Sequence, residues 1–178
     1  LAHRRQRQMC IRDSTEDTHL LFSYHGLPVS HVKRIDRSKA HCQTVEACCT
    51  VKCEANSLCY GRHCNETTMA VVERLGLKPD QWSLSYQSRL GPVKWLEPST
   101  TQMVEALVKK GVKKLAIVAP AFLADGLETL EELNIGIREE FMEHGGTELK
   151  VINCLNDDEQ WVRGLEQLIA KEFEQAVA

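Results

Sequence analysis

The sequence predicts an α/β fold, a doubly wound parallel sheet of four strands flanked by helices. Short apolar runs alternate with segments of helical period in the order β-α-β-α-β-α-β-α. Such alternation is typical of parallel sheets with right-handed crossovers. The run from Lys114 to Ala119 is apolar throughout after its lysine, as expected for a strand buried on both faces. The 178 residues are enough for one domain with its own core.

Four strands are predicted from apolar or alternating runs that end at turn residues. The first is a buried run stopped at once by Gly26 and Pro28, and the second alternates polar and apolar residues. The strands are expected at about 19–24, 82–87, 114–119 and 149–154.

Four helices are predicted from caps, closing glycines and apolar residues at helical spacing. No helix is predicted in the polar stretch from Val29 to Ala40, which has no clear period. The helices are expected over 67–75 up to Gly76, from Ser99 or Thr100 to Gly111, from the capping Asp125 to His144, and from Asn156 or Asp157 onward. The last one gathers its apolar residues on one face: Trp161, Val162, Leu165, Leu168, Ile169 and Phe173.

Composition and motifs exclude several classes of function. No apolar run approaches the ~18 residues of a membrane span. The net charge is −3, and four arginines lie in the first 14 residues, so the remainder is more acidic still. An acidic body argues against nucleic acid as a partner. The sequence has neither a glycine-rich dinucleotide fingerprint nor a phosphate loop, which argues against hydride transfer and phosphoryl transfer.

The segment 1–14 looks foreign to the fold, because it has neither apolar periodicity nor capping residues. It also lacks the apolar centre of a signal peptide. We interpret it as non-native to the fold, with the gene truncated upstream, or as a disordered tail. The domain is therefore placed at 15–178, and a cytoplasmic location is expected.

His25 is the first candidate functional residue. It ends the first strand within the sequence Ser-Tyr-His-Gly-Leu-Pro, and ligands of open α/β sheets bind beyond the carboxyl ends of strands. An imidazole that is largely neutral at pH 7 can accept a proton or bind a metal. The alternative is a histidine that only hydrogen-bonds its loop.

A row of carboxylates follows the strongest strand. Asp125, Glu128 and Glu132 are spaced three and four apart, which places them on one face of a helix. They could attract a cation or pass protons outward. The alternative is a capping aspartate with a solvated acidic face, since acids favour a helix N-terminus.

The segment after the second strand combines polar side chains with an exposed-looking Trp95. A flat aromatic ring at the rim of a cleft can stack on a flat ligand, or it can simply pack against the protein. Its motif has two parts, Gln87-Ser88-Arg89-Leu90-Gly91 and Trp95-Leu96-Glu97-Pro98-Ser99-Thr100.

Together these three motifs, each at a strand end, resemble the ferrochelatase family. The resemblance covers about Thr18 to the C-terminus. It implies insertion of Fe²⁺, the substrate metal, into a porphyrin in haem biosynthesis, with protoporphyrin IX and coproporphyrin III both open. It also implies two similar α/β halves with the porphyrin between them. This chain resembles only the second half, so the N-terminal half would be its missing partner, and half a site would bind a porphyrin poorly.

The resemblance implies a role for each matching residue. His25 and Glu128 would be the catalytic pair that handles the metal and the pyrrole protons, in an order that stays open. Asp125 and Glu132 would form an acidic path from Glu128. The implied porphyrin contacts are Trp95, Tyr24, Gln87 and Ser88.

A cysteine-rich insert at about 41–64 departs from the simplest family pattern. Six of the eight cysteines lie in it, and clustered cysteines in a cytosolic enzyme more often bind metal than form disulfides. Because the family includes enzymes with a 2Fe–2S cluster on four thiolates, we predict such a cluster. The rival is a structural zinc that recruits His41 or His63. The predicted ligands are Cys42, Cys49, Cys59 and Cys64, with Cys48 as substitute ahead of Cys53.

Two other function classes stay open. One is a non-enzymatic iron–sulfur or zinc-binding module, which would leave His25, Glu128 and Trp95 without a shared role. The other is a chelatase for another metal or tetrapyrrole, because metal choice depends on fine geometry that motifs do not define.

Overall fold

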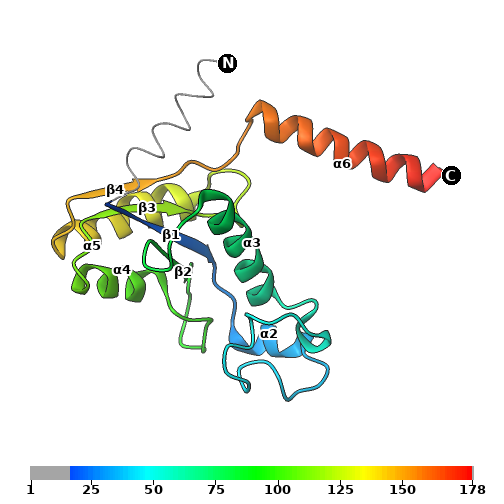
Figure 1. Cartoon of the computed structure of the whole chain (residues 1–178), viewed down its shortest axis with the longest axis horizontal. Helices are drawn as coiled ribbons and strands as arrows, with labels where there is room; N and C mark the ends of the chain where they lie inside the picture. The colour runs from blue at the N-terminus through cyan, green and yellow to red at the C-terminus, as the bar shows by residue number, and fades with distance from the viewer. Residues whose placement is uncertain (1–16, 178) are drawn as a thin grey trace.

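The structure is a computed structural model that describes residues 17–177. The segment 1–14 therefore lies outside the described residues. The described chain forms a four-stranded sheet in the order β2-β1-β3-β4, with every neighbouring pair parallel (Figure 1). The strands are β1 (Thr18–His25), β2 (Trp82–Gln87), β3 (Lys114–Val118) and β4 (Glu148–Val151). The predicted fold class is confirmed.

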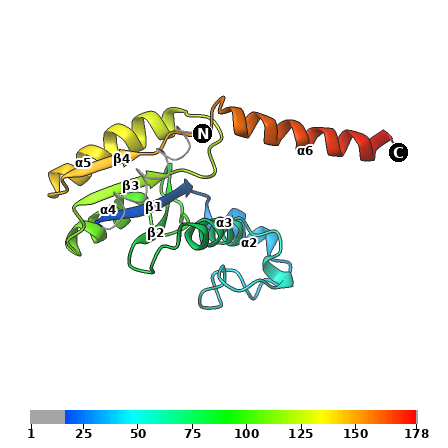
Figure 2. The ribbon, with the colours of Figure 1, turned by 45° about the horizontal axis from the view of Figure 1, so that its top comes forward.

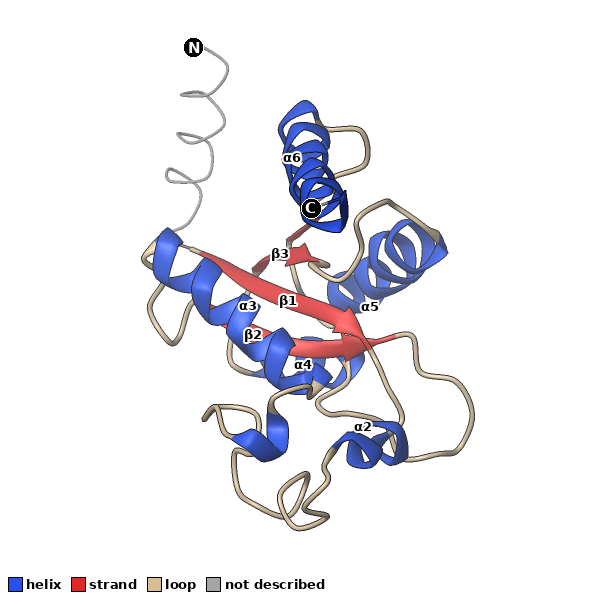
Figure 3. Ribbon diagram, turned by 90° about the vertical axis from the view of Figure 1, so that its right-hand side faces the viewer, coloured by secondary structure: helices blue, strands red, loops and turns tan. Residues whose placement is uncertain are grey.

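Helices flank this sheet on both sides (Figure 3). One core lies under α2 and α3 and contains Phe22 and Val72, and the other lies under α4 and α5 and contains Leu115 and Phe141. The helices are α2 (Val29–Ile35), η1 (Glu54–Asn56), α3 (Tyr60–Leu75), α4 (Thr100–Lys109), η2 (Glu128–Ile137), α5 (Arg138–Glu143) and α6 (Glu159–Val177).

Two predictions for the segment between β1 and β2 were wrong. A short helix, α2, occupies part of the stretch expected to lack one, because Val29 and Val32 are buried there against the sheet. Helix α3 begins at Tyr60 rather than near residue 67. Its first turns bury Arg62 and Cys64, residues that do not mark a helix in a hydrophobicity pattern.

The predicted caps are partly confirmed. Ser99 caps α4 by accepting a hydrogen bond from the Gln102 amide (3.2 Å), and Gly76 closes α3 at φ +67°. The start of α6 was wrong, since Asp158 accepts from the first helical amides while Asn156 binds elsewhere.

The helix after β3 also differs from the prediction. Its first ten residues, Glu128–Ile137, form a π-helix that continues as α5. The expected cap, Asp125, accepts instead from the Thr129 hydroxyl and from the Cys154 amide. A π-helix is rare and frequently occurs at a functional site, so this segment is a candidate for part of the site.

Helix α6 extends away from the sheet (Figures 1 and 2). Its predicted apolar face exists but is not covered: Leu168 is 61% and Phe173 is 68% exposed. No described helix, α6 included, is long and apolar enough to cross a bilayer. Among the residues that the structure describes, the apolar face of α6 is therefore an unpartnered surface.

Replacing Phe141 by alanine should destabilise the chain by about 3–5 kcal/mol, the usual cost of deleting a buried aromatic ring. The ring is fully buried and packs directly over Gly146. The matched control is Phe173→Ala on α6, which should change the free energy of unfolding by less than about 0.5 kcal/mol. Urea unfolding of the 178-residue chain measures both, and equal losses would contradict the packing described above.

Candidate active site and cysteine cluster

The order of the strands reverses between β1 and β3, and a binding crevice is expected at that point. The chain steps from β1 to β2 on one side of the sheet and from β3 to β4 on the other. Ligands of doubly wound sheets bind at such a switch point, outside the carboxyl ends of the strands. Here those ends are His25, the last residue of β1, and the loop from Ala119 that leads into the π-helix.

The imidazole of His25 is held so that one nitrogen stays available. Its Nδ1 donates to the carbonyl oxygen of Gly26 (2.7 Å), which leaves Nε2 with a lone pair. Phe122, from the loop after β3, lies beside the ring at a centroid distance of 6.0 Å. The hydroxyl of Tyr60 donates to the main-chain oxygen of His25 (2.9 Å). The loop after β3 thus contacts the ring of His25, and α3 holds its main chain.

Glu128 begins the π-helix and is half-buried. The Gln87 side-chain amide donates to its main-chain oxygen (3.4 Å), and Gln87 in turn accepts from the Ser23 hydroxyl (2.5 Å). Ser23 also contacts the Thr100 hydroxyl (2.8 Å) at the start of α4. This buried polar chain ties β1, β2 and α4 to the main chain of Glu128.

The other two acids of the predicted row are engaged with different parts of the fold. Glu132 accepts from the amide (2.8 Å) and the hydroxyl (2.9 Å) of Ser88, which itself adopts φ +61°. Asp125 pairs reciprocally with Asn156, at 2.8 and 2.7 Å. That pairing, with the Thr129 hydroxyl, lowers the pKa of Asp125. Among the three, Glu128 alone has no hydrogen bond to its carboxylate within the described residues.

Trp95 lies against the loop that carries His25. Its ring carbon Cε3 is 3.3 Å from where a Cβ on Gly26 would stand, and Leu96 donates to the oxygen of Leu27 (3.0 Å). Gly26 is required here, because its Cβ would also meet the Gln87 oxygen at 2.7 Å. The indole Nε1 is buried and has no partner in the described part of the chain.

Two of the expected porphyrin contacts are buried within the protein. Tyr24 is 3% exposed and its hydroxyl contacts Thr68 on α3 (2.9 Å); burial raises its pKa to about 12. Gln87 is 1% exposed and belongs to the polar chain beneath Glu128. The structure thus places His25 at the end of β1, Ser88 just after β2, Glu128 at the start of the π-helix and Trp95 against Gly26, while Tyr24 and Gln87 are buried.

Four of the six clustered cysteines lie close together. Cys42, Cys48 and Cys59 line one small pocket beside Asp36 and His41. The Cys48 and Cys49 sulfurs are 3.8 Å apart. The interaction with Cys49, with the amides at the start of α3, lowers the pKa of Cys59. The same interaction, together with burial, raises the pKa of Cys49.

The remaining two cysteines have other neighbours. Cys64 contacts the Tyr60 hydroxyl, and burial raises its pKa to about 12. The Cys53 sulfur lies 3.7 Å from His41 Nε2. His63 is exposed and bonded to the Ser57 oxygen (3.1 Å). Within residues 17–177 no three histidine, cysteine or acidic side chains are already arranged to hold a metal ion.

Sequence reasoning missed several residues of the site. Tyr60 and Phe122 both contact His25, but both are distant from it in the sequence. Only the folded chain brings α3 and the loop after β3 next to β1. Asn156, in a loop, and Asn56, at the end of η1, are paired polar residues, and nothing in their sequence surroundings distinguishes them. The one available signal was position, since Tyr60 directly follows a predicted ligand.

The sequence profile of the family described as Ferrochelatase matches residues 2–173. Curated ferrochelatases from Bdellovibrio bacteriovorus and Pseudomonas syringae are each 45% identical to this chain, over 154 and 150 residues. One from Stutzerimonas stutzeri is 46% identical over 155 residues. These matches cover 84–86% of this chain but only 44–45% of each relative. The chain thus spans about half the length of the curated relatives it matches.

A solved structure adds a likeness of fold. It is described as a cobalamin (vitamin B12) biosynthesis CbiX protein from Marinobacter aquaeolei VT8, with a TM-score of 0.50 and 17% sequence identity. The superposition covers 89% of this chain and 98% of that one. At this identity the likeness concerns the arrangement of the sheet and helices alone.

Proposed function

The chain belongs to the ferrochelatase family, and from that premise we propose that it is the second half of an enzyme that inserts Fe²⁺ into a porphyrin. One observation carries the proposal. An imidazole with a free nitrogen ends β1, and a carboxylate without a hydrogen-bond partner in the described chain begins the helix that follows the neighbouring parallel strand β3. Both lie in the motifs that resemble the family.

These residue types suit the chemistry of metalation. The two pyrrole protons must leave as the divalent ion enters the ring. Because Nδ1 of His25 is engaged with Gly26, its Nε2 is the nitrogen that accepts a proton. Glu128 supplies negative charge for the hydrated cation, and carboxylate oxygens are ligands that divalent ions accept. Asp125 precedes Glu128 in the loop before the helix, and Glu132 follows it on the helix. Both carboxylates already accept hydrogen bonds, from Asn156 and Ser88.

The porphyrin would lie against Trp95. The indole packs on Gly26 beside His25, so a flat ligand that meets the imidazole would also meet this ring. Ser88, held by Glu132, would lie at the same rim. The substrate class proposed is a porphyrin, with protoporphyrin and coproporphyrin equally compatible with these contacts.

The proposal includes a preceding half that covers α6. The apolar face of this helix is exposed in the described chain, and the curated relatives are about twice as long as the matched region. The family profile reaches residue 173 and so includes most of α6. We infer that the other half packs on this face and supplies the opposite wall of the crevice.

The cysteine segment is proposed to hold a 2Fe–2S cluster. The donors are soft thiolates, which suit iron–sulfur ligation, and the described cysteines are free of disulfides, as in a cytoplasmic protein. Cys42, Cys49 and Cys59 would be three of the ligands. The fourth would be Cys64, or Cys48, whose sulfur lies 3.8 Å from that of Cys49. When bound, such a cluster supplies a one-electron redox centre and a cross-link between the loop and α3.

The complete enzyme, expressed from the recovered upstream coding sequence, should convert porphyrin and Fe²⁺ to haem. Loss of porphyrin fluorescence measures the reaction, and the 178-residue chain alone should show less than about 1% of that rate, because proximity within a closed site is lost. A complete enzyme that prefers Co²⁺ or Ni²⁺ would reassign it to another chelatase. One that metalates no porphyrin would reject the proposal.

A further inference from the structure

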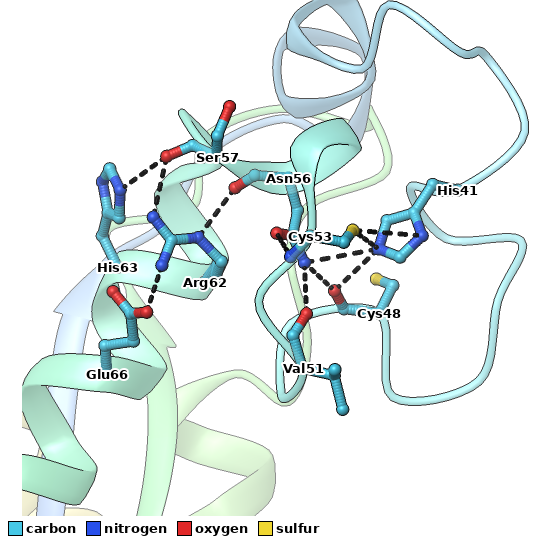
Figure 4. A network of polar contacts seen from close by, with 9 residues as sticks. All are labelled: His41, Cys48, Val51, Cys53, Asn56, Ser57, Arg62, His63 and Glu66. Atoms are coloured by element: carbon cyan, nitrogen blue, oxygen red, sulfur yellow. Dashed lines mark hydrogen bonds and ion pairs between the residues drawn. The ribbon is translucent and has the colours of Figure 1, made fainter.

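A single buried side chain holds the cysteine loop together from inside (Figure 4). Asn56 is 2% exposed. Its Nδ2 donates to the main-chain oxygens of Cys48 (2.9 Å) and Val51 (2.8 Å), and its Oδ1 accepts from the amide of Cys53 (2.9 Å). Both amide hydrogens and the carbonyl oxygen of the side chain are thus used, on three points of the same loop.

Asn56 is itself fastened to helix α3. Its main-chain oxygen accepts from Arg62 Nε (2.8 Å) and from the amide of Cys59 (2.9 Å). Arg62 is 4% exposed, also donates to the Ser57 oxygen (2.7 Å), and forms an ion pair with Glu66. The loop that carries Cys48 and Cys49 is therefore linked through Asn56 to the helix whose start carries Cys59 (Figure 4).

The side-chain amide of Asn56 acts mainly on the main chain of the loop and also contacts His41 Nε2 (3.4 Å). Asn56 lines the same pocket as Cys42, Cys48 and Cys59, yet its side chain does not hydrogen-bond their thiols. The Cys49 and Cys59 sulfurs both lie beside Gly61, 3.0 and 4.0 Å from where a Cβ on that glycine would stand. Removing the Asn56 amide would leave three main-chain groups of the loop without their partners, and a loop with fewer internal bonds opens more readily.

We propose that Asn56 is a positioning residue that sets the cysteine loop in the metal-free protein, so that cluster assembly depends on it although it is not a ligand. The claim about cluster assembly rests on the proposed cluster. The claim that Asn56 orders the loop does not depend on any metal. Residues behind metal ligands commonly change metal affinity by about 10–100-fold when they are replaced.

The loop is tested first in the metal-free 178-residue chain. Lys52 is exposed and lies between Val51 and Cys53, two of the three points that Asn56 holds. Asn56→Ala and Asn56→Asp should each raise the rate of limited trypsin cleavage after Lys52 at least several-fold, since both lose the two donors. The matched control is Asn153→Ala, at an exposed asparagine outside the segment. Unchanged cleavage in both Asn56 variants would overturn the inference.

Cluster assembly is tested by reconstitution with iron and sulfide. Wild type and Asn153→Ala should load to the same iron and acid-labile sulfide content, whereas Asn56→Ala and Asn56→Asp should load at least about tenfold less at limiting iron. Unfolding curves of the metal-free variants separate a loosened loop from loss of the fold. Wild-type loading in the variants would overturn the inference and leave the cluster standing. A wild type that binds zinc and remains colourless would overturn the cluster, with the cleavage result still deciding the role of Asn56.

Discussion

In the complete enzyme, His25→Ala and Glu128→Ala are each expected to lower the rate of porphyrin metalation at least about 100-fold. Positioned general acids and bases contribute roughly 10²–10⁴-fold, and these two side chains are the ones left available at the crevice. His25 keeps Nε2 free because Nδ1 binds Gly26 (2.7 Å). Initial rates with Fe²⁺ and porphyrin measure the effect, and unfolding curves show whether each variant stays folded.

Two neighbouring substitutions serve as controls. His31→Ala removes an exposed imidazole of α2, and Glu131→Ala removes an exposed carboxylate of the same π-helix. Both should retain metalation within about twofold, because surface substitutions away from a site have small effects. Near-normal rates in His25→Ala or Glu128→Ala would reject the assignment of that residue.

Cys59→Ser should abolish the cluster. Cys59 is buried at the start of α3, where its neighbour Cys49 and the amides of Arg62 and Gly61 lower its pKa. A serine hydroxyl stays protonated and does not replace a thiolate in iron–sulfur ligation. Iron and sulfide per chain, with the visible spectrum, measure the loss in the reconstituted 178-residue chain.

Cys154→Ser is the matched control, since Cys154 lies after β4, outside the segment. It should load as wild type does. Full iron content in Cys59→Ser would end the ligand assignment. The same assay on Cys48→Ser and Cys64→Ser identifies the fourth ligand, because only one of the two should lose the cluster.

The four strands were predictable because each is a continuous or alternating apolar run, and burial of such runs requires little knowledge of the rest of the chain. Their order in the sheet was not predicted. Ser99 and Gly76 were also predictable, as caps act on residues three or four positions away. Helix α2 was not, because only two valines of its seven residues are buried, and their burial depends on where β1 lies.

The candidate site was half predictable. Strand ends indicate where ligands bind, so His25 and the acidic row that includes Glu128 could be chosen from position, while Glu128 was singled out by the resemblance to the family. The partners of Glu132 and Asp125 could not, since Ser88 and Asn156 come from segments more than thirty residues away in the chain. The same holds for Tyr60, which joins the cysteine segment to His25.

By itself the sequence determined the α/β class, the four strands, the clustered thiols and the motifs at the strand ends, because each depends on residues near one another in the chain. The tertiary structure alone decided which carboxylate stays free, that Tyr24 and Gln87 face inward, and that Asn56 holds the cysteine loop. The physical reason is that a buried polar group must find a partner, and the fold determines which distant group comes within hydrogen-bonding distance.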